Sequence, residues 1–211
     1  EPDTWRPGNF ALLVPGGGLG AAVWDGQDRG GGFSWLVTLG NEAVLDSGDF
    51  IRAMAADEGT RVIGLILEGV KKGDAFRAAV AEAHARGKFV IAMHQGRTAE
   101  GRQAAALHTG VLATGDAVNA AVLAELGVPR ATDPDELSHL GALFGRYGAP
   151  QGRGVGIVSI SGGAGTLGAD PAAFHGIALP QPSAGTTAEL KKILVSYASA
   201  ANPMDLTTAV Y

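Results

Sequence analysis

The chain has 211 residues, of which 46% are hydrophobic and 18% are charged. This balance is too apolar for a disordered chain and allows a buried core in one large or two modest domains. The net charge is −5 and no Lys/Arg cluster exceeds a pair, which argues against a nucleic-acid partner. No apolar run approaches the roughly 18 residues that a bilayer span needs, and no secretory leader pattern is visible. Cysteine is absent, which excludes disulfides and fits a cytoplasmic location.

Strand and helix patterns alternate from the start of the chain. Continuous apolar runs, typical of buried strands, are predicted over residues 11–14, 33–39, 61–69 and 88–94. Helical spacing of apolar residues predicts one helix from about Asp46 and another capped by Asp74. Such alternation with short glycine-bearing turns is typical of a doubly wound parallel sheet, an α/β fold.

The alternation breaks after Gly96. Residues 97–114 are polar and glycine-spaced and are predicted to be irregular, with helices returning over 116–126 and 135–144. A linker is predicted over 145–154, followed by a strand over 155–159, a glycine-rich turn and a helix. What remains is short for a complete doubly wound domain. We therefore predict one domain over residues 1–148 and the start of a second, incomplete α/β domain over 149–211.

Two glycine-rich turns lead from a strand into a helix. The run Val14–Gly20 can be laid over Ser159–Gly165, and each carries a G-G-x-G turn. Free backbone N–H groups at a helix start, together with the helix dipole, favour a bound phosphate. Tight packing of helix on strand is the alternative explanation for either turn.

Two other chemistries compete for these turns. Gly16, Gly18 and Ala21 fit the dinucleotide pattern G-x-G-x-x-A, and Glu42 lies roughly where a ribose-binding acid is expected. A nicotinamide-binding domain is therefore an alternative. A hydrolase is disfavoured, because the serines at 159 and 161 lack the leading glycine of G-x-S-x-G.

Two polar residues are the candidates for catalysis. His108 lies in A-A-L-H-T-G, and Glu68 follows an almost wholly apolar strand. Glu68 should therefore lie at the carboxyl edge of the sheet, where ligands bind in open α/β folds. A carboxylate that accepts one ring N–H of histidine leaves the other ring nitrogen nucleophilic. Spacing alone does not place Glu68 beside His108, and His94, which ends a strand at the same edge, is a weaker candidate.

The run G-R-T-A-E-G-R-Q-A-A-A-L-H-T-G-V-L-A-T-G-D-A-V, which begins at Gly96, resembles the phosphohistidine segment of nucleotide-forming acyl-CoA synthetases. That superfamily includes ADP-forming acetyl-CoA synthetase and the α chain of succinyl-CoA synthetase. Further stretches agree in order: G-G-L-G-A-A-V at Gly17, L-G-N at Leu39, L-I-L-E-G at Leu65, S-G-G-A-G at Ser161 and N-P-M-D-L-T at Asn202.

The resemblance implies two flavodoxin-like domains and an acid-thiol ligase. Such a ligase makes acyl-CoA, ADP and phosphate from a carboxylic acid, CoA and ATP, through an acyl phosphate. His108 would carry the phosphoryl group and Glu68 would orient its ring. The resemblance implies that the phosphate is held by Gly17, Gly18, Leu19, Gly20, Thr109, Gly110, Ser161, Gly162, Gly163, Ala164 and Gly165.

The resemblance also implies partners. CoA-binding and nucleotide-binding (ATP-grasp) domains are expected in the same or a partner chain, with Mg²⁺ bound beside the nucleotide there and no metal in these residues. We also expect a homo-oligomer. Val14 and Gly16 depart from the serines usual in the first turn, and His94 stands where lysine is common. The altered turn motivates a further alternative, a non-catalytic CoA- or acyl-CoA-sensing module fused to an acyltransferase.

Overall fold

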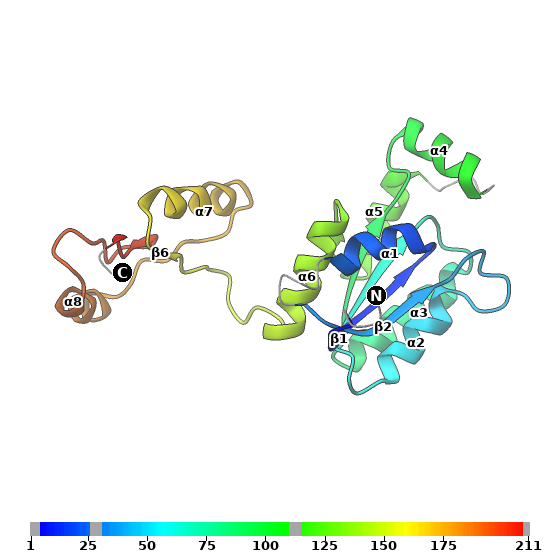
Figure 1. The fold of residues 1–211 in the computed structure, drawn as a ribbon, viewed down its shortest axis with the longest axis horizontal. Coiled ribbons are helices and arrows are strands. Elements are labelled where there is room, and N and C mark those ends of the chain that lie inside the picture. The colour runs from blue at the N-terminus through cyan, green and yellow to red at the C-terminus, as the bar shows by residue number, and fades with distance from the viewer. Residues whose placement is uncertain (1–4, 26–30, 110–114, 209–211) are drawn as a thin grey trace. The chain divides into compact units, whose positions relative to one another are not determined.

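The computed structural model describes residues 5–25, 31–109 and 115–208, without the side chains of residues 108 and 109. The chain divides into two compact units, Glu1–Gly148 and Ala149–Tyr211. Figure 1 shows the elements of each unit.

The first unit is built on a parallel five-stranded sheet with the strand order β2-β1-β3-β4-β5. Each neighbouring pair is parallel, as the alternation of strands and helices predicts. All six residues of β3 are buried, which explains why its sequence is continuously apolar rather than alternating. The strands are β1 (Pro7–Val14), β2 (Phe33–Thr38), β3 (Val62–Leu67), β4 (Phe89–His94) and β5 (Arg130–Ala131).

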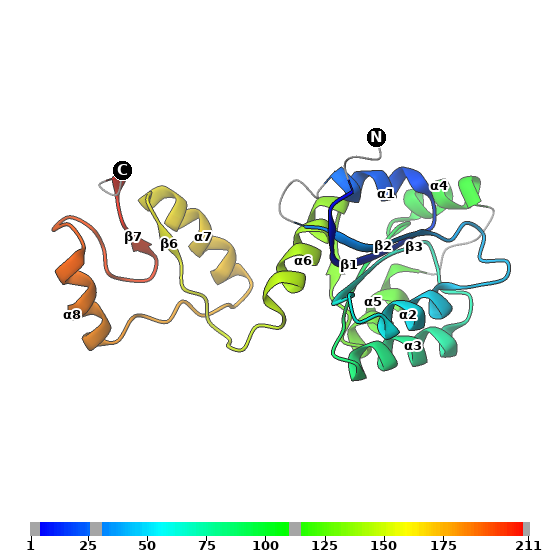
Figure 2. The same cartoon turned by 60° about the horizontal axis from the view of Figure 1, so that its bottom comes forward.

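Helices cover both faces of this sheet, as Figure 2 shows. One core cluster joins the sheet to α2 (Ser47–Ala56), α3 (Gly73–Ala85) and α5 (Asp116–Glu125). The other joins the opposite face to α1 (Gly17–Trp24) and α6 (Pro134–Tyr147). The helical spacing of apolar residues predicts inner faces of Phe50, Ile51, Met54 and Ala55 in α2 and of Phe76, Val80 and Ala83 in α3. All of these residues are buried except Phe50, which is half-buried against the same cluster.

Two glycines make room for one aromatic ring between the sheet and α6. A Cβ at Gly64 would lie 2.5 Å from the ring of Phe10, and a Cβ at Gly141 would lie 2.7 Å from it. Real Cβ atoms do not approach so closely, so the Phe10 ring occupies the space that side chains at these positions would need. Gly64 in β3 and Gly141 in α6 therefore let the helix pack closely on the sheet.

Two local predictions were wrong. Residues 97–114 are not irregular throughout, because α4 runs over Ala99–Thr109. The Thr98 hydroxyl accepts a hydrogen bond from the Gly101 amide (3.0 Å), as an N-cap does, and the alanines that follow have high helix propensity. Asp74 is not the cap of α3: the helix starts at Gly73 with Lys72 as N-cap, and Asp74 lies in the first turn.

Two later elements, α6 and β6, also differ from their predicted bounds. Helix α6 continues to Tyr147, three residues past the predicted end, and ends at Gly148, whose φ of 72° suits glycine. The second unit contains a parallel pair, β6 (Val158–Ser159) and β7 (Met204–Asp205), with α7 (Gly162–Phe174) and α8 (Ala184–Ile193). Strand β6 is shorter than predicted from the sequence.

One side chain, Asn202, organises this second unit. Its Nδ2 donates to the carbonyls of Val155 (2.8 Å) and Pro180 (2.9 Å), and its Oδ1 accepts from the Ile157 amide (3.0 Å). Asn202 is 9% exposed, so these bonds satisfy a buried amide. The asparagine thereby ties the chain that leads into β7 to the chain that leads into β6.

Candidate active site

A pocket of about 450 Å³ lies at the carboxyl edge of the five-stranded sheet. The chain leaves β1, β2, β3 and β4 into its wall, so four parallel strands contribute to one site. This edge also contains the point between β1 and β3 where the strand order reverses, which is where open α/β sheets bind ligands. The lining residues are Pro15, Gly16, Gly18, Leu19, Gly40, Asn41, Glu68 and Gln95.

The first glycine turn supplies one wall of this pocket. Gly16 is the N-cap of α1 in an extended conformation (φ −149°, ψ 160°) and, having no side chain, makes no cap hydrogen bond. A Cβ at Gly16, Gly17 or Gly18 would meet nothing within 4 Å. The start of α1 is thus uncovered, and its first amides are available to an anion.

The predicted residues of this turn fall into two groups. Gly18 and Leu19 line the pocket with Glu68. Gly17 and Gly20 line a neighbouring, mostly apolar depression on α1. A Cβ at Gly20 would lie 3.3 Å from Val14, which indicates that Gly20 also serves the packing of α1 on β1.

Glu68 lies where the sequence predicts, directly after β3 at the carboxyl edge. Its side chain is half-buried and lines the pocket. Among the described residues, no hydrogen-bond or ion-pair partner of its carboxylate is found. The Glu68 carboxylate is therefore available at this pocket to orient a ligand or another side chain.

Gln95 was not among the site residues predicted from the sequence. It follows β4, donates its backbone N–H to the Leu67 carbonyl (2.9 Å) and lines the pocket beside Glu68. Its Nε2 is buried with no hydrogen-bond partner among the described residues. An unpaired buried amide is costly, so it favours a partner supplied by a ligand or by a change of conformation. The register of β3 and β4 could have indicated this neighbour of Glu68, once the strand pairing was known.

His108 lies in the last turn of α4, which leaves the carboxyl end of β4 and projects from the body of the first unit (Figure 1). The side chains of His108 and Thr109, and all of Gly110, lie outside the described residues. The predicted pairing of His108 with Glu68 thus stays a prediction.

Two other residues named from the sequence lie near this edge without lining the pocket. His94 is 4% exposed, its Nε2 lies 2.7 Å from Asn119 Nδ2, and burial lowers its pKa. Glu42, the proposed ribose-binding acid, has a positive φ of 48°, and partial burial raises the pKa of its carboxyl. Glu42 is therefore half-buried and has a strained backbone conformation.

The second glycine turn differs from the first in its cap. Ser161 is the N-cap of α7, and its hydroxyl accepts from the Ala164 amide (3.4 Å). A Cβ at Gly162 would lie 2.9 Å from an Oδ atom of Asp205, which follows from the parallel pairing of Ser159 with Asp205. A carboxylate therefore stands beside the second predicted phosphate site, and sequence reasoning did not assign it a role.

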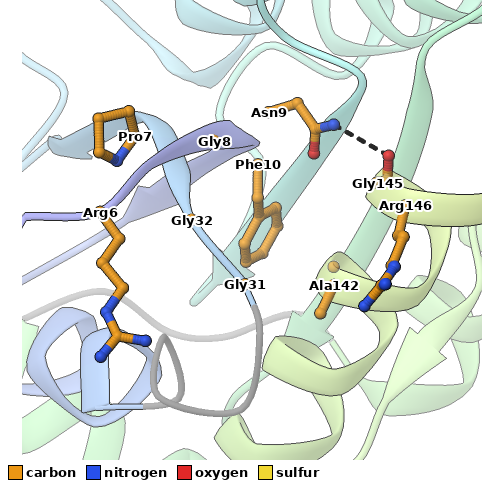
Figure 3. Close-up of a pocket in the computed structure, with 11 residues that line it drawn as sticks. Arg6, Pro7, Gly8, Asn9, Phe10, Gly31, Gly32, Ala142, Gly145 and Arg146 are labelled. Carbon is orange, nitrogen blue, oxygen red and sulfur yellow. Dashed lines mark hydrogen bonds between the residues drawn. The ribbon is translucent and has the colours of Figure 1, made fainter.

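A pocket of about 410 Å³ lies at the amino end of β1 (Figure 3). Arg6 and Arg146 border it, and Asn9 Nδ2 donates to the Gly145 carbonyl (2.9 Å) in its wall. This pocket is at the sheet edge opposite to Glu68. Because open α/β sheets bind ligands at their carboxyl edge, the pocket beside Glu68 is the candidate active site.

Residues 7–144 match the family described as the succinyl-CoA ligase like flavodoxin domain. The chain belongs to this family. The resemblance inferred from the sequence and its flavodoxin-like fold are thereby confirmed. Among the described residues, no helix is long and apolar enough to cross a membrane, and no three metal-ligating side chains gather.

The members most similar to this chain include ADP-forming acetate–CoA ligases. The chain is 35% identical to ligase I of Archaeoglobus fulgidus over 94% of its own length and 29% of that protein. It is 35% identical to the ligase I α subunit of Pyrococcus furiosus over 98% of its own length and 44% of that subunit.

A solved structure is also similar to this chain. Acetyl-coenzyme A synthetase 1 of Candidatus Korarchaeum cryptofilum, in complex with phosphate and ADP, matches with a TM-score of 0.86 and 31% identity. The match covers 95% of this chain and 44% of that one. The chain thus spans less than half the length of these relatives.

Proposed function

We propose that this chain is part of an ADP-forming acyl-CoA synthetase. The complete enzyme would convert a carboxylic acid, CoA and ATP into acyl-CoA, ADP and phosphate. The γ-phosphoryl group would pass from ATP to His108 and then to the acid, giving an acyl phosphate. The CoA thiol would then attack the acyl carbon. The thioester bond forms as the bond to phosphate breaks, so acyl-CoA and phosphate are released.

The observation that carries this proposal is the pocket beside Glu68. A carboxylate without a partner among the described residues faces an uncovered helix N-terminus there, and both line one cavity. The H-T-G segment leaves the same sheet edge through α4. This combination suits a phosphorylated histidine, because the backbone amides attract phosphate and the carboxylate accepts a ring N–H. The ADP-forming ligases among the relatives support the same reaction.

Each group has a distinct task in this scheme. Phosphoryl transfer requires positioning and charge stabilisation more than covalent assistance. The amides at the start of α1 would hold the phosphoryl oxygens without reorganising during the reaction. Glu68 would fix the tautomer of His108 so that its other nitrogen points at phosphorus. Ser161 and its turn would contribute a second set of amides.

The remaining components are proposed as follows. CoA-binding and ATP-grasp domains, in this chain's full polypeptide or a partner, would supply the other substrates, with Mg²⁺ beside the nucleotide there. Residues 149–211 would begin a second domain related to the first. We also propose a cytoplasmic homo-oligomer.

Phosphorylation of the complete enzyme tests this proposal. Incubation with γ-labelled ATP should give an acid-labile, alkali-stable label that the variant His108→Asn lacks. Acid-dependent consumption of CoA should vanish in the same variant. A label that persists in His108→Asn would overturn the assignment. Stabilisation by NAD with no label in either protein would instead favour the dinucleotide alternative.

A further inference from the structure

Asp116 is shared by two arginines. Its Oδ1 accepts a hydrogen bond from Arg130 Nη2 and lies 3.6 Å from Arg97 Nε. The Asp116 and Arg130 side chains are only 28% and 22% exposed, respectively. Burial alone would raise the pKa of Asp116, but the hydrogen bond and charge of Arg130 and the charge of Arg97 hold it below its usual value. The carboxylate is thus charged and shared between both partners.

The positions of these residues along the chain relate this contact to His108. Arg97 precedes α4, and Asp116 is the first residue of α5, so the two residues bracket the segment that carries His108. Arg130 lies in β5 and is in register with Ala92 of β4. The three side chains therefore hold the two ends of this segment, its base, next to each other and attach them to the sheet.

A second contact secures the same helix start. Asn119, one turn after Asp116 in α5, places its Nδ2 2.7 Å from Nε2 of His94, the last residue of β4. Asp116 and Asn119 lie three residues apart on one face of α5, so both reach the strands below. The first turn of α5 is thus held at β4 and at β5.

The helix that carries His108 contrasts with this base. No residue from 99 to 107 is buried, and Leu107 is 84% exposed. Helices of this length are marginal unless a face packs against other structure. Residues 101, 102, 105 and 106 are half-buried on one face of α4, so among the described residues packing holds this helix only weakly, and the charged base is a further attachment.

We propose that Asp116, with Arg97 and Arg130, forms a clamp that positions His108 for phosphoryl transfer. Asp116 is a positioning residue in this proposal, which rests on the function proposed above. A displacement of about 1 Å can slow a reaction roughly 100-fold. A loosened base should therefore reduce the rate of transfer more than the amount of protein able to react.

The test is single-turnover phosphorylation of the complete enzyme with γ-labelled ATP. Asp116→Asn should lower the rate constant about tenfold or more while leaving the final amount of label unchanged. Arg97→Gln, at a more exposed position, should act in the same direction. The double variant should be no slower than Asp116→Asn, since each change breaks the same contact between residues 97 and 116.

Arg77→Gln is the matched control. Arg77 Nη1 lies 2.7 Å from Glu125 Oε1, so this change removes an ion pair from the other end of α5. Its rate constant should equal that of the wild type. Unchanged rate constants in both clamp variants would overturn the proposal, as would a loss confined to the final amount of label, which indicates misfolding. If Asp116→Asn does not fold, Arg97→Gln decides the matter. Label that survives in His108→Asn would instead refute the proposed function.

Discussion

Lys72 Nζ lies 2.8 Å from Asp46 Oδ2, and this ion pair links the N-caps of two helices, α3 and α2. Lys72 follows the loop that starts at Glu68, so the pair also joins that loop to the one after β2. Asp46 is 5% exposed, and its other oxygen accepts from the amides of Gly48 (2.8 Å) and Asp49 (3.2 Å). One buried carboxylate therefore serves a helix cap and a loop contact together.

Asp46→Ala should destabilise the first unit by about 2 kcal/mol, because the capping bonds and the ion pair are both lost. Lys72→Ala should destabilise the unit less than Asp46→Ala does, since the Lys72 side chain is 63% exposed and the capping bonds remain. Urea unfolding of the two variants measures the difference. Equal losses of unfolding free energy would mean that the ion pair, rather than the capping hydrogen bonds, accounts for the contribution of Asp46.

Glu68→Gln should reduce turnover about 100-fold, since a neutral amide cannot fix the imidazole in the same way. Its stability should match the wild type, because no described residue depends on the Glu68 carboxylate. Glu58→Gln is the matched control, an exposed acid in the turn before β3 at the opposite sheet edge. Steady-state rates with saturating substrates test this. Full activity of Glu68→Gln would remove Glu68 from the mechanism.

The lowered pKa of His94 predicts how the free energy of unfolding depends on pH. Burial is the main cause of its lowered pKa, with Arg130 and Arg97 acting in the same direction and Asp116 opposing them. The unfolded chain therefore binds a proton at higher pH than the folded chain does. The stabilising contribution is complete above the ordinary pKa of 6.5 and is lost as the pH falls through the lower folded value.

Urea unfolding at pH 8 and at pH 5.5 should show this loss in the wild type. The loss should be smaller in His94→Gln, which has nothing to titrate there. His84→Gln, at an exposed position, should behave as the wild type does. The same pH dependence in all three proteins would contradict the assignment to His94.

The two glycine turns allow a reciprocal exchange of caps. Gly16→Ser should stabilise α1 by about 0.3 kcal/mol, because the extended backbone suits a cap and the new Cβ meets no atom within 4 Å. Ser161→Gly should destabilise α7 by a similar amount. Thermal unfolding measures both changes. Calorimetric titration with inorganic phosphate should show tighter binding to Gly16→Ser, because the added hydroxyl can donate to the anion. Unchanged affinity would argue against phosphate at that turn.

The sequence predicted the architecture well where burial alone decides the pattern. Strand β3 is a continuous apolar run because both faces are covered, and the runs of β1 and β4 follow the same logic. Helix α4 was missed because Gly101 and the polar residues around it resemble a loop. Its cap, Thr98, is recognisable only with the helix known.

The carboxyl-edge position of Glu68 and the uncovered start of α1 follow from the sequence itself, because local patterns fix where each strand ends. The order β2-β1-β3-β4-β5 does not, and it alone brings Gln95 and Asn41 to the pocket wall beside Glu68. The same holds for Asp116, which meets Arg130 only after β5 pairs with β4. Contacts between residues distant in the chain depend on strand pairing, which local composition does not encode.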